Sequence, residues 1–454
     1  MFDNPGRQGR RHIRRNRLLT LSGALILVSA LAACTQPSGG NSTTPAGPSS
    51  TATTPASSSA PAPKTTVKVS YLWSGPEGDA FQALITAFNQ SQSAIEVVGT
   101  SNPDQQAQVL SMQGSSPQFD ISDTGNSQIV QWAQSGALLS LSDFIQADGY
   151  DTADFLPAAL KNNTVDGKLY ALPLATNTYQ LLYNKKVLAD AGFTTPPATF
   201  EDWAKVIAKV SKVDNGQIVR LGVQPSIDYG LLAEAYGGSW YDAQGNPTPN
   251  NPKNVQALQW WLDNVVTPFG YDKLQTFQSG LGDWGTSQYP FYVGDFATMF
   301  DGPWQSAFIK RLAPDLDWGA APLPYPADNP SVAGKSRLDL ANMFIPANAA
   351  HPREAWEFMK FILSKEQMLS FDVALANLPG RLSLLDNPGF ADLPNFNAFL
   401  QALKSPLVEP AYSTKFSAQY GSDMSAAFND IVTGAKTPQA ALDDLAQKAQ
   451  AYAR

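Results

Sequence analysis

The fold depends most on one stretch, Gly167-Lys-Leu-Tyr-Ala-Leu-Pro-Leu-Ala-Thr-Asn-Thr-Tyr-Gln-Leu-Leu-Tyr-Asn-Lys-Lys-Val-Leu-Ala-Asp190. Leu169 to Leu174 is largely apolar and predicts a strand that stops at polar residues. Tyr179 to Tyr183 predicts a second strand, and Asn184 predicts the start of a helix because asparagine caps helices well. Two extended segments therefore meet within this stretch.

The junction between these two strands is polar. Pro173 cannot donate a hydrogen bond to a central ladder, so we expect the first strand to end or bend near it. Thr176, Asn177 and Thr178 are then expected to form an exposed crossover, with Thr176 and Asn177 facing the floor of a cleft. We interpret this crossover as a hinge between two lobes.

The length and composition of the chain indicate a large globular protein. A chain of 454 residues with 43% hydrophobic and 15% charged residues can build more than one core, so we expect two large domains in a monomer. The formal net charge is −8, although six arginines lie within the first 17 residues. Because the rest of the chain is more acidic still, nucleic acid is excluded as an expected partner.

The N-terminus has the pattern of a secretory signal. An apolar run, Leu18 to Ala33, follows the arginines and is shorter than the roughly 20 residues that span a bilayer comfortably. Its end, Leu31-Ala-Ala-Cys34, resembles the lipobox of bacterial lipoproteins, in which cleavage leaves the cysteine to be acylated, as with palmitate. We therefore predict a signal peptide over residues 1–33 and a lipid anchor on Cys34, which is the only cysteine and has no disulfide partner.

Residues 34–65 consist almost entirely of Ser, Thr, Pro, Ala and Gly. Such a segment cannot bury enough apolar surface to become ordered, so it is expected to be a disordered tether. The folded part would then be held at the extracytoplasmic face of the bacterial membrane. Both general and twin-arginine export stay open, because neither arginine pair precedes a clean twin-arginine pattern.

Strand patterns alternate with helix patterns along the rest of the chain, which predicts an α/β fold with a mostly parallel sheet. Ligands of such sheets bind beyond the carboxyl ends of the strands, which here points to Trp73–Glu77, Asp120–Asn126 and the crossover. The expected strands are Thr66–Trp73, Ile95–Val98, Phe119–Ile121, Val219–Val223, Gly294–Phe300 and Leu340–Ile345. The expected helices are a helix on the face Phe81, Leu84, Ile85 and Phe88, then Asp104–Met112, Ser127–Ser135, Phe200–Val213, Leu231–Tyr236, Val255–Val266, Pro352–Leu363, Glu366–Ala374 and Met424–Tyr452 with a turn at Thr433-Gly434.

The sequence offers few catalytic groups. With only His12, His351 and Cys34, it predicts neither a Cys/His metal site nor a Cys/His nucleophile pair. Gly280-Leu-Gly-Asp-Trp-Gly285 follows no convincing strand and leads into no helix, so it predicts no dinucleotide site. No cofactor, metal or enzymatic activity is expected. The carboxylate pairs that a glycosidase would need remain formally available as Asp120 with Asp123, or Asp295 with Asp301.

Aromatic residues are more informative. The chain contains ten Trp, fifteen Tyr and twenty-three Phe. A sugar presents apolar faces that stack on aromatic rings and hydroxyls that need polar partners, so carbohydrate sites combine both. Trp73, Trp240, Trp304 and Tyr420 stand at the ends of expected elements beside Gly, Pro or Asp, where a side chain is free to face a cleft.

Several segments together resemble the extracellular solute-binding proteins of ABC sugar importers, the family that contains maltose-binding protein. The central one reads Pro173-Leu-Ala, four residues, Gln180-Leu-Leu-Tyr-Asn184, three residues, Leu188-Ala-Asp190, and departs from the family at Gln180, where a small residue is usual. Four further segments fit the same order: Gly294–Trp304, Met343–Leu363, Leu378-Pro-Gly-Arg381 and Thr433–Leu442. The resemblance spans roughly Val67 to the C-terminus.

The resemblance implies a two-lobed, periplasmic-binding-protein-like fold that closes on a ligand in the cleft between its lobes. It places one lobe at 66–176 plus 323–384 and the other at 177–322 plus 385–454. Trp304 would stack on a sugar and Trp240 would form a cleft wall. The residues expected to line the site are Trp73, Glu77, Asp123, Asn177, Trp240, Trp304, Arg381 and Tyr420.

The resulting prediction is a lipid-anchored binding protein that delivers a sugar or oligosaccharide to the permease of an ABC transporter. Two alternatives stay open: a secreted carbohydrate-active hydrolase, and the same fold binding a polyol phosphate. The second requires basic groups at the cleft, and Arg381 with Lys185 or Lys335 would have to supply them.

Overall fold

The computed structural model describes residues 64–102, 104–115 and 118–453. The expected signal peptide, Cys34 and nearly all of the expected tether lie outside these residues. Within the described part of the chain, no helix is both long and apolar enough to cross a membrane.

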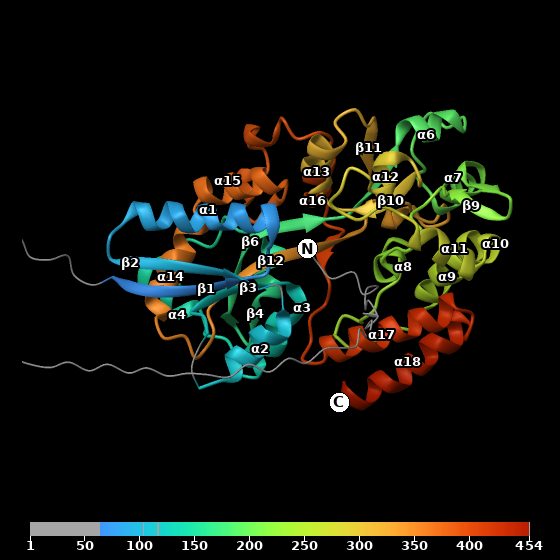
Figure 1. Cartoon of the computed structure of the whole chain (residues 1–454). Helices are drawn as coiled ribbons and strands as arrows, with labels where there is room; N and C mark the ends of the chain where they lie inside the picture. The colour runs from blue at the N-terminus through green and yellow to red at the C-terminus, as the bar shows by residue number, and fades with distance from the viewer. Residues whose placement is uncertain (1–63, 103, 116–117, 454) are drawn as a thin grey trace, which may run out of the picture. The chain divides into compact units, whose positions relative to one another are not determined.

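The described chain alternates strands and helices as expected (Figure 1). The strands are β1 (Thr65–Tyr71), β2 (Ile95–Ser101), β3 (Ile121–Thr124), β4 (Thr164–Val165), β5 (Lys168–Leu169), β6 (Ala171–Thr178), β7 (Gln180–Asn184), β8 (Lys212–Asp214), β9 (Gln217–Arg220), β10 (Thr298–Asp301), β11 (Trp318–Ala321), β12 (Ser336–Phe344), β13 (Leu378–Pro379) and β14 (Val408–Pro410). The helices are α1 (Gly75–Ser91), α2 (Gln105–Gln113), α3 (Asn126–Gln134), α4 (Ser142–Asp148), α5 (Pro157–Asn162), α6 (Lys185–Asp190), α7 (Phe200–Val210), α8 (Tyr229–Ala235), α9 (Pro252–Trp261), α10 (Thr267–Phe269), α11 (Tyr271–Ser279), α12 (Pro290–Val293), α13 (Gln305–Leu312), α14 (Pro352–Ile362), α15 (Lys365–Leu375), α16 (Phe396–Leu403), α17 (Ser417–Val432) and α18 (Pro438–Tyr452).

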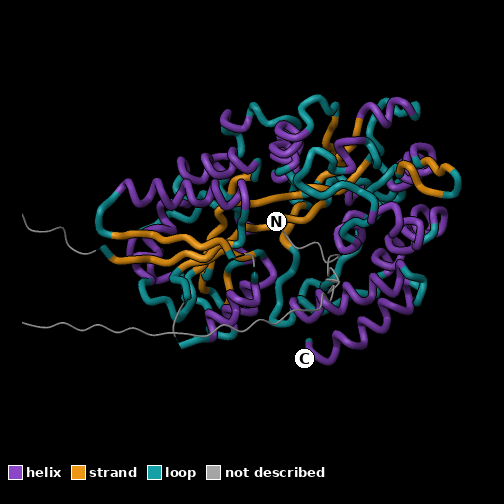
Figure 2. The backbone as a smooth tube through the Cα atoms, in the orientation of Figure 1, coloured by secondary structure: helices purple, strands orange, loops and turns teal. Residues whose placement is uncertain are grey.

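The larger sheet has the strand order β13-β6-β12-β3-β1-β2, and β14 also pairs with β12. Strand β1 runs parallel to β2 and β3, whereas β12 runs antiparallel to β3 and β6. Met343 and Phe344 are neighbours in β12, so they face opposite sides of the sheet. Met343 packs in the core beneath α1, α14 and α15, and Phe344 packs in the core formed with α2 and α3 (Figures 1 and 2). Helices therefore cover both faces of this sheet, as expected for an α/β fold. The expectation of a mostly parallel sheet is wrong, because β12 runs antiparallel to β3 and β6, β13 runs antiparallel to β6, and the smaller sheet is antiparallel.

The smaller sheet is β10-β7-β11, with β7 antiparallel to both neighbours. Its core includes Leu181 and Leu182 of β7 and the α7 residues Phe200 and Trp203, all fully buried. The chain thus builds two lobes, each with its own sheet and core. The predicted boundaries of the lobes within the sequence remain a prediction.

The predictions around the central stretch are partly confirmed. Asn184 caps α6, since its side chain accepts a hydrogen bond from the Val187 amide. Strand β6 continues through Pro173, and the register of β12 shifts opposite it, between Ala341 and Asn342. The expected exposure of residues 176–178 is wrong: all three are buried, because β12 pairs with this end of β6 and β13 pairs with Thr176.

Two other expected elements differ in length. The expected strand from Gly294 begins only at Thr298, because Gly294 adopts a left-handed conformation with φ of 83° and ends α12. A strand needs extended backbone, so it cannot start at a left-handed residue. The expected helix Val255–Val266 is found as α9, which starts at Pro252, followed by a π-helical turn over Leu262–Val266.

Asp372 on α15 is fully buried, and neither of its carboxylate oxygens has a hydrogen-bond partner among the described residues. Burial raises the pKa of Asp372 well above its ordinary value, because the charged form is poorly solvated there. In the unfolded chain an aspartate ionises near pH 4, so this group should progressively destabilise the fold as the pH rises above that value.

We therefore expect Asp372→Asn to raise the melting temperature at pH 7, by an amount that shrinks toward pH 4. The free energy of unfolding should increase by about 1–3 kcal/mol at pH 7, because the variant no longer buries a carboxylate without a hydrogen-bond partner. Thermal melts across this pH range, with the exposed Asp79→Asn as control, test the prediction. An equal gain at both pH values would show that Asp372 does not titrate as expected.

Candidate functional site

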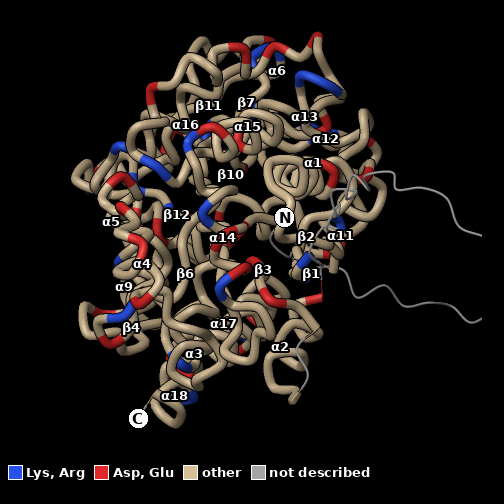
Figure 3. The backbone as a smooth tube through the Cα atoms, turned by 90° about the vertical axis from the view of Figure 1, so that its left-hand side faces the viewer, with Lys and Arg blue, Asp and Glu red and all other residues tan. Residues whose placement is uncertain are grey.

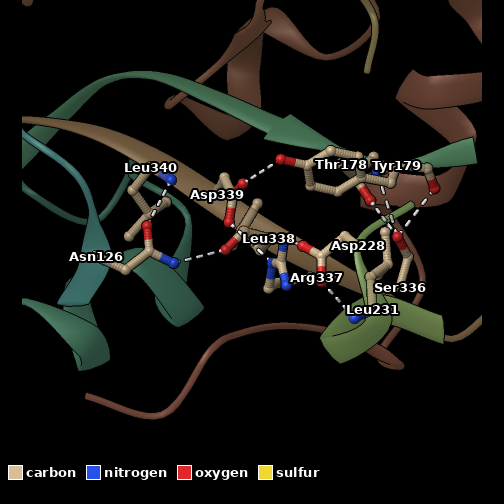
Figure 4. Close-up of polar contacts among 10 residues, drawn as sticks. All are labelled: Asn126, Thr178, Tyr179, Asp228, Leu231, Ser336, Arg337, Leu338, Asp339 and Leu340. Carbon is tan, nitrogen blue, oxygen red and sulfur yellow. Dashed lines mark hydrogen bonds and ion pairs between the residues drawn. The ribbon is translucent and has the colours of Figure 1, made fainter. Parts of the chain in front are cut away.

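The chain passes from the larger sheet to the smaller one through a single residue, Tyr179, which separates β6 from β7. Ser336, the first residue of β12, fastens this junction. Its hydroxyl accepts a hydrogen bond from the Tyr179 amide at 3.2 Å, donates to the Tyr179 carbonyl at 2.9 Å and lies 3.1 Å from the Thr178 hydroxyl (Figure 4). The junction predicted at residues 176–178 is thus one residue further along.

The strands β6 and β12 carry polar side chains on one face. Asn177 lies opposite Asp339, and Leu338 opposite Thr178, so Tyr179 and Arg337 are the next neighbours along the same face as Asn177 and Asp339. The sequence predicted that Thr176 faces the cleft together with Asn177. This is wrong, because neighbouring residues of a strand face opposite sides of the sheet, and the Thr176 hydroxyl donates to the carbonyls of Leu378 and Pro379 in the neighbouring segment.

Tyr179, Asp228, Arg337 and Asp339 form a connected group that we call the crossover cluster (Figure 4). The Arg337 guanidinium bonds Asp228 at 2.6 Å and Asp339 at 3.3 Å. The Tyr179 hydroxyl donates to the other oxygen of Asp339 at 2.5 Å. Asp228 also caps α8 by accepting from the Leu231 amide at 2.9 Å, so the cluster joins β12 to the smaller-sheet lobe.

The charged groups of the cluster are partly desolvated. Desolvation is the largest single influence on the pKa of Asp228, but attraction to Arg337, together with hydrogen bonds from Arg337 and from the Leu231 and Gly230 amides, outweighs it and holds that pKa below its ordinary value. The Asp228 side chain still keeps 42% of its surface exposed. Nearby, desolvation raises the pKa of Glu234 to about 7. The cluster therefore combines groups crowded by protein with a carboxylate that solvent reaches.

Trp304 adjoins the crossover cluster through Tyr179. It follows β10 and the Gly302-Pro303 turn, is half-buried, and meets the ring of Tyr179 edge-on at 6.0 Å between centroids. Gly302 permits this position, because a Cβ there would lie 2.2 Å from the indole ring. Desolvation raises the pKa of the adjacent Asp301 to about 6.

The larger-sheet lobe contributes Asn126, the first residue of α3. Its side chain donates to the Leu338 carbonyl and accepts from the Leu340 amide, both at 2.7 Å (Figure 4). These two bonds continue the pairing of β12 beyond the end of β3. Asn126 therefore fixes the connecting strand to the lobe that carries β1, β2 and β3.

The structure brings two of the predicted site residues to the crossover. Trp304 and Asn177 adjoin the cluster, and the buried amide oxygen of Asn177 has no hydrogen-bond partner among the described residues. Glu77 lies in the first turn of α1 and is half-buried, and one of its carboxylate oxygens has no hydrogen-bond partner among the described residues. Desolvation is the main cause that raises the pKa of Glu77. Its predicted part in ligand binding stays a prediction.

The other predicted site residues are buried and have partners within the protein. Trp73 packs against Phe81 and Phe371, so the expectation that its ring is free to face a cleft does not hold. Trp240 donates to the Gly230 carbonyl, and Tyr420 donates to the carbonyl of Trp240.

Asp123 and Arg381 are also buried and have hydrogen-bond partners within the protein. Asp123 is 3% exposed and accepts from the Leu72 amide at 2.8 Å, and desolvation raises its pKa to about 7. Arg381 donates to the Leu363 carbonyl and the Tyr150 hydroxyl, both at 2.8 Å, and pairs with Asp154 at 3.3 Å. Their predicted part in ligand binding remains a prediction.

The sequence analysis missed the members of the crossover cluster. Arg337 and Asp339 are two residues apart, the spacing that puts side chains on one face of a strand, but the predicted strand began only at Leu340. Asp228 has the signature of a helix cap three residues before Leu231. The spacing of Arg337 and Asp339 and the helix-cap position of Asp228 were both visible in the sequence.

Comparison with known proteins gives one family match and many relatives. Residues 83–398 match the family model for bacterial extracellular solute-binding proteins. A maltotriose-binding protein of Pyrococcus abyssi is 24% identical over 353 residues, which is 76% of this chain and 73% of that protein. The maltodextrin-binding protein MdxE of Bacillus subtilis is 30% identical over 188 residues, which is 38% of this chain and 41% of that protein.

Solved structures share the fold. CpMnBP1 with mannotriose bound superimposes with a TM-score of 0.78 at 24% identity, covering 85% of this chain and all of that one. The substrate-binding protein Lmo0181 of Listeria monocytogenes, in complex with cycloalternan, gives a TM-score of 0.73 at 20% identity, covering 86% and 99%. These similarities confirm the two-lobed α/β fold.

Proposed function

Since the chain belongs to the bacterial extracellular solute-binding protein family, we propose that it captures a sugar or oligosaccharide between its lobes and delivers it to the permease of an ABC importer. One observation carries the choice of ligand. The half-buried ring of Trp304 stands beside the carboxylates of the crossover cluster, at the place where the chain passes between lobes. A stacking surface next to fixed hydrogen-bond acceptors suits a sugar ring.

The charges of the site favour an uncharged saccharide over a polyol phosphate. The three cations considered for a phosphate already have partners: Lys185 pairs with Asp317, Lys335 donates to the Gly238 carbonyl, and Arg381 pairs with Asp154. Arg337 is matched by two carboxylates. An anionic ligand would have to displace one of these pairs, whereas sugar hydroxyls can donate to the exposed carboxylate of Asp228.

A hydrolase is less well supported. Of the two carboxylate pairs considered, Asp120 accepts hydrogen bonds from the amides of Lys68, Ala350 and His351, which is a structural role. Asp301 accepts from the Gly302 amide and the Gln305 side chain. The family and the relatives above are substrate-binding proteins, so we propose binding without catalysis.

The location and the remaining partners follow from the same proposal. The lipobox-like Leu31-Ala-Ala-Cys34 supports a lipid anchor on Cys34, which would hold a monomer at the extracytoplasmic face of the membrane. In the view of Figure 3, basic residues of the described chain are interspersed with acidic ones. A mixed distribution of charged residues of this kind gives no reason to propose a nucleic-acid partner.

The proposal is tested by titrating the purified protein with maltotriose, mannotriose, cycloalternan and glycerol 3-phosphate. Calorimetry and tryptophan emission should show saturable binding of at least one neutral oligosaccharide and none of the phosphate. Mass spectrometry should find the sugar intact after incubation. Binding of glycerol 3-phosphate alone, or release of new reducing ends, would favour one of the two alternatives.

A further inference from the structure

Arg337 has protein partners at two of its nitrogens and on one face of its guanidinium. Nη2 bonds Asp228 at 2.6 Å, Nε bonds Asp339 at 3.3 Å, and the guanidinium carbon lies 5.2 Å from the centre of the Tyr179 ring (Figure 4). Only 16% of the side chain is exposed. Most of the Arg337 side chain is therefore engaged within the protein.

Tyr179 is held in three ways. The Arg337 guanidinium lies over its ring, its hydroxyl donates to Asp339 at 2.5 Å, and its ring meets Trp304 at an interplanar angle of 85°. Among the described residues, Tyr179 supplies the only aromatic ring recorded in contact with Trp304. Trp304 also makes a side-chain hydrogen bond to Asp301, so the orientation of its indole is set jointly by Asp301 and by the place where Tyr179 is held.

We propose that Arg337 is a positioning residue of the sugar site: it holds Tyr179, and through Tyr179 the Trp304 ring, in the orientation on which a sugar stacks. The inference rests on the proposed function for its ligand, but the positioning itself is a property of the unliganded protein. Because Asp228 both pairs with Arg337 and caps α8, the same contact ties the connecting strand β12 to the smaller-sheet lobe.

The charges around Arg337 explain why a cation is needed there. Without the guanidinium, Asp228 and Asp339 would lose the counter-charge they share, with Glu234 close enough to perturb the same groups electrostatically. Like charges that are partly desolvated repel, so the carboxylates would move apart or take up protons. Lysine could restore the charge, but it lacks the planar fork that bonds two carboxylates and stacks on a ring.

The test uses full-length protein labelled with 5-fluorotryptophan and observed by fluorine NMR without ligand. The Trp304 resonance is identified as the one that disappears in Trp304→Phe. We expect Arg337→Gln to shift or broaden this resonance, and Arg337→Lys to perturb it less. The resonance of Trp356, in the other lobe, should stay in place.

Arg353 provides a matched control, because it also bonds two carboxylates, Asp148 and Glu357, and lies over an aromatic ring, that of Phe144. The Trp356 indole donates to the same Asp148. Arg353→Gln should therefore move the Trp356 resonance and leave that of Trp304 unchanged. An effect of both arginine variants on every tryptophan would mean general destabilisation and would overturn the proposal.

Affinity provides a second readout, with maltotriose and mannotriose as probes. We expect Arg337→Gln to weaken binding about tenfold, the range for losing one aromatic pairing, and to weaken it little further in a Trp304→Phe background. If Arg337→Gln does not fold, Tyr179→Phe replaces it, since it removes only the bond to Asp339 and should also shift the Trp304 resonance.

The two proposals fail separately. A Trp304 resonance that stays in place in the arginine and tyrosine variants overturns the positioning, whether or not a sugar binds. A shifted resonance in a protein that binds none of the saccharides supports the positioning and overturns the proposed function. Equal losses of affinity from Arg337→Gln with and without the Trp304 indole would also overturn the positioning.

Discussion

Replacing Trp304 with alanine is expected to weaken saccharide binding by at least about 2 kcal/mol, roughly thirtyfold. The indole offers the stacking surface at the crossover, and tryptophan commonly dominates the energy of an interface when it is well positioned. The fold should survive, because Trp304 is half-buried and does not belong to the hydrophobic core of either lobe. Isothermal titration with the saccharide that binds the wild type measures the loss.

Trp260→Ala is the matched control for this variant. Trp260 is also half-buried, but it stacks on Trp203 at 5.1 Å where α9 packs against α7. Its removal should lower the melting temperature of the protein and leave the affinity of the folded molecules unchanged. If Trp304→Ala bound sugar as tightly as the wild type, the ligand would have to lie elsewhere in the molecule.

Local patterns predicted much of the fold. The helix α1 buries Phe81, Leu84, Ile85 and Phe88, the four residues whose spacing predicted it. The start of α7 is fixed by the Thr199 side chain, which accepts from an amide three residues later. These features depend on residues that are close in sequence, so the sequence alone carries the information.

The extent of β12 could not be predicted in the same way. Its first residues include Arg337 and Asp339, and charged residues are not typical of a buried strand. Their place in the strand depends on partners far away in sequence: Asp228 is 109 residues from Arg337, and Tyr179 is 160 residues from Asp339. Only the folded chain brings these charges together.

The same limit applies to the aromatic residues of the site. Trp73, Trp240 and Trp304 all stand beside breaks in regular structure, so all three were predicted to line the ligand site. Trp73 is covered by Phe371, a residue from the distant helix α15, and Trp240 by Phe428 of α17. Trp304 alone of the three keeps a substantial part of its ring exposed. Long-range packing, which no local pattern records, separates the core rings from the candidate ligand contact.

Replacing Arg381 with methionine is expected to destabilise the larger-sheet lobe by about 3 kcal/mol without changing the affinity for sugar. The sequence resemblance places Arg381 at the rim of the ligand site. In the structure it is 6% exposed, lies 4.1 Å from the centre of the Phe155 ring and bonds the Leu363 carbonyl and Asp154. Methionine retains bulk but removes the donor to the Leu363 carbonyl and one of the partners of Asp154, which keeps Lys365 and Ser383.

Urea unfolding followed by titration of the folded variant separates the two roles of Arg381. Arg353→Met is the control, because that arginine also pairs with carboxylates but is 48% exposed, and exposed pairs contribute at most about 1 kcal/mol. A stable Arg381→Met variant that no longer binds the sugar would mean that Arg381 takes part in ligand binding. A destabilised variant with full affinity would instead mean that the Leu-Pro-Gly-Arg turn serves this lobe by fastening β13 to the end of α14, through the bond from Arg381 to Leu363.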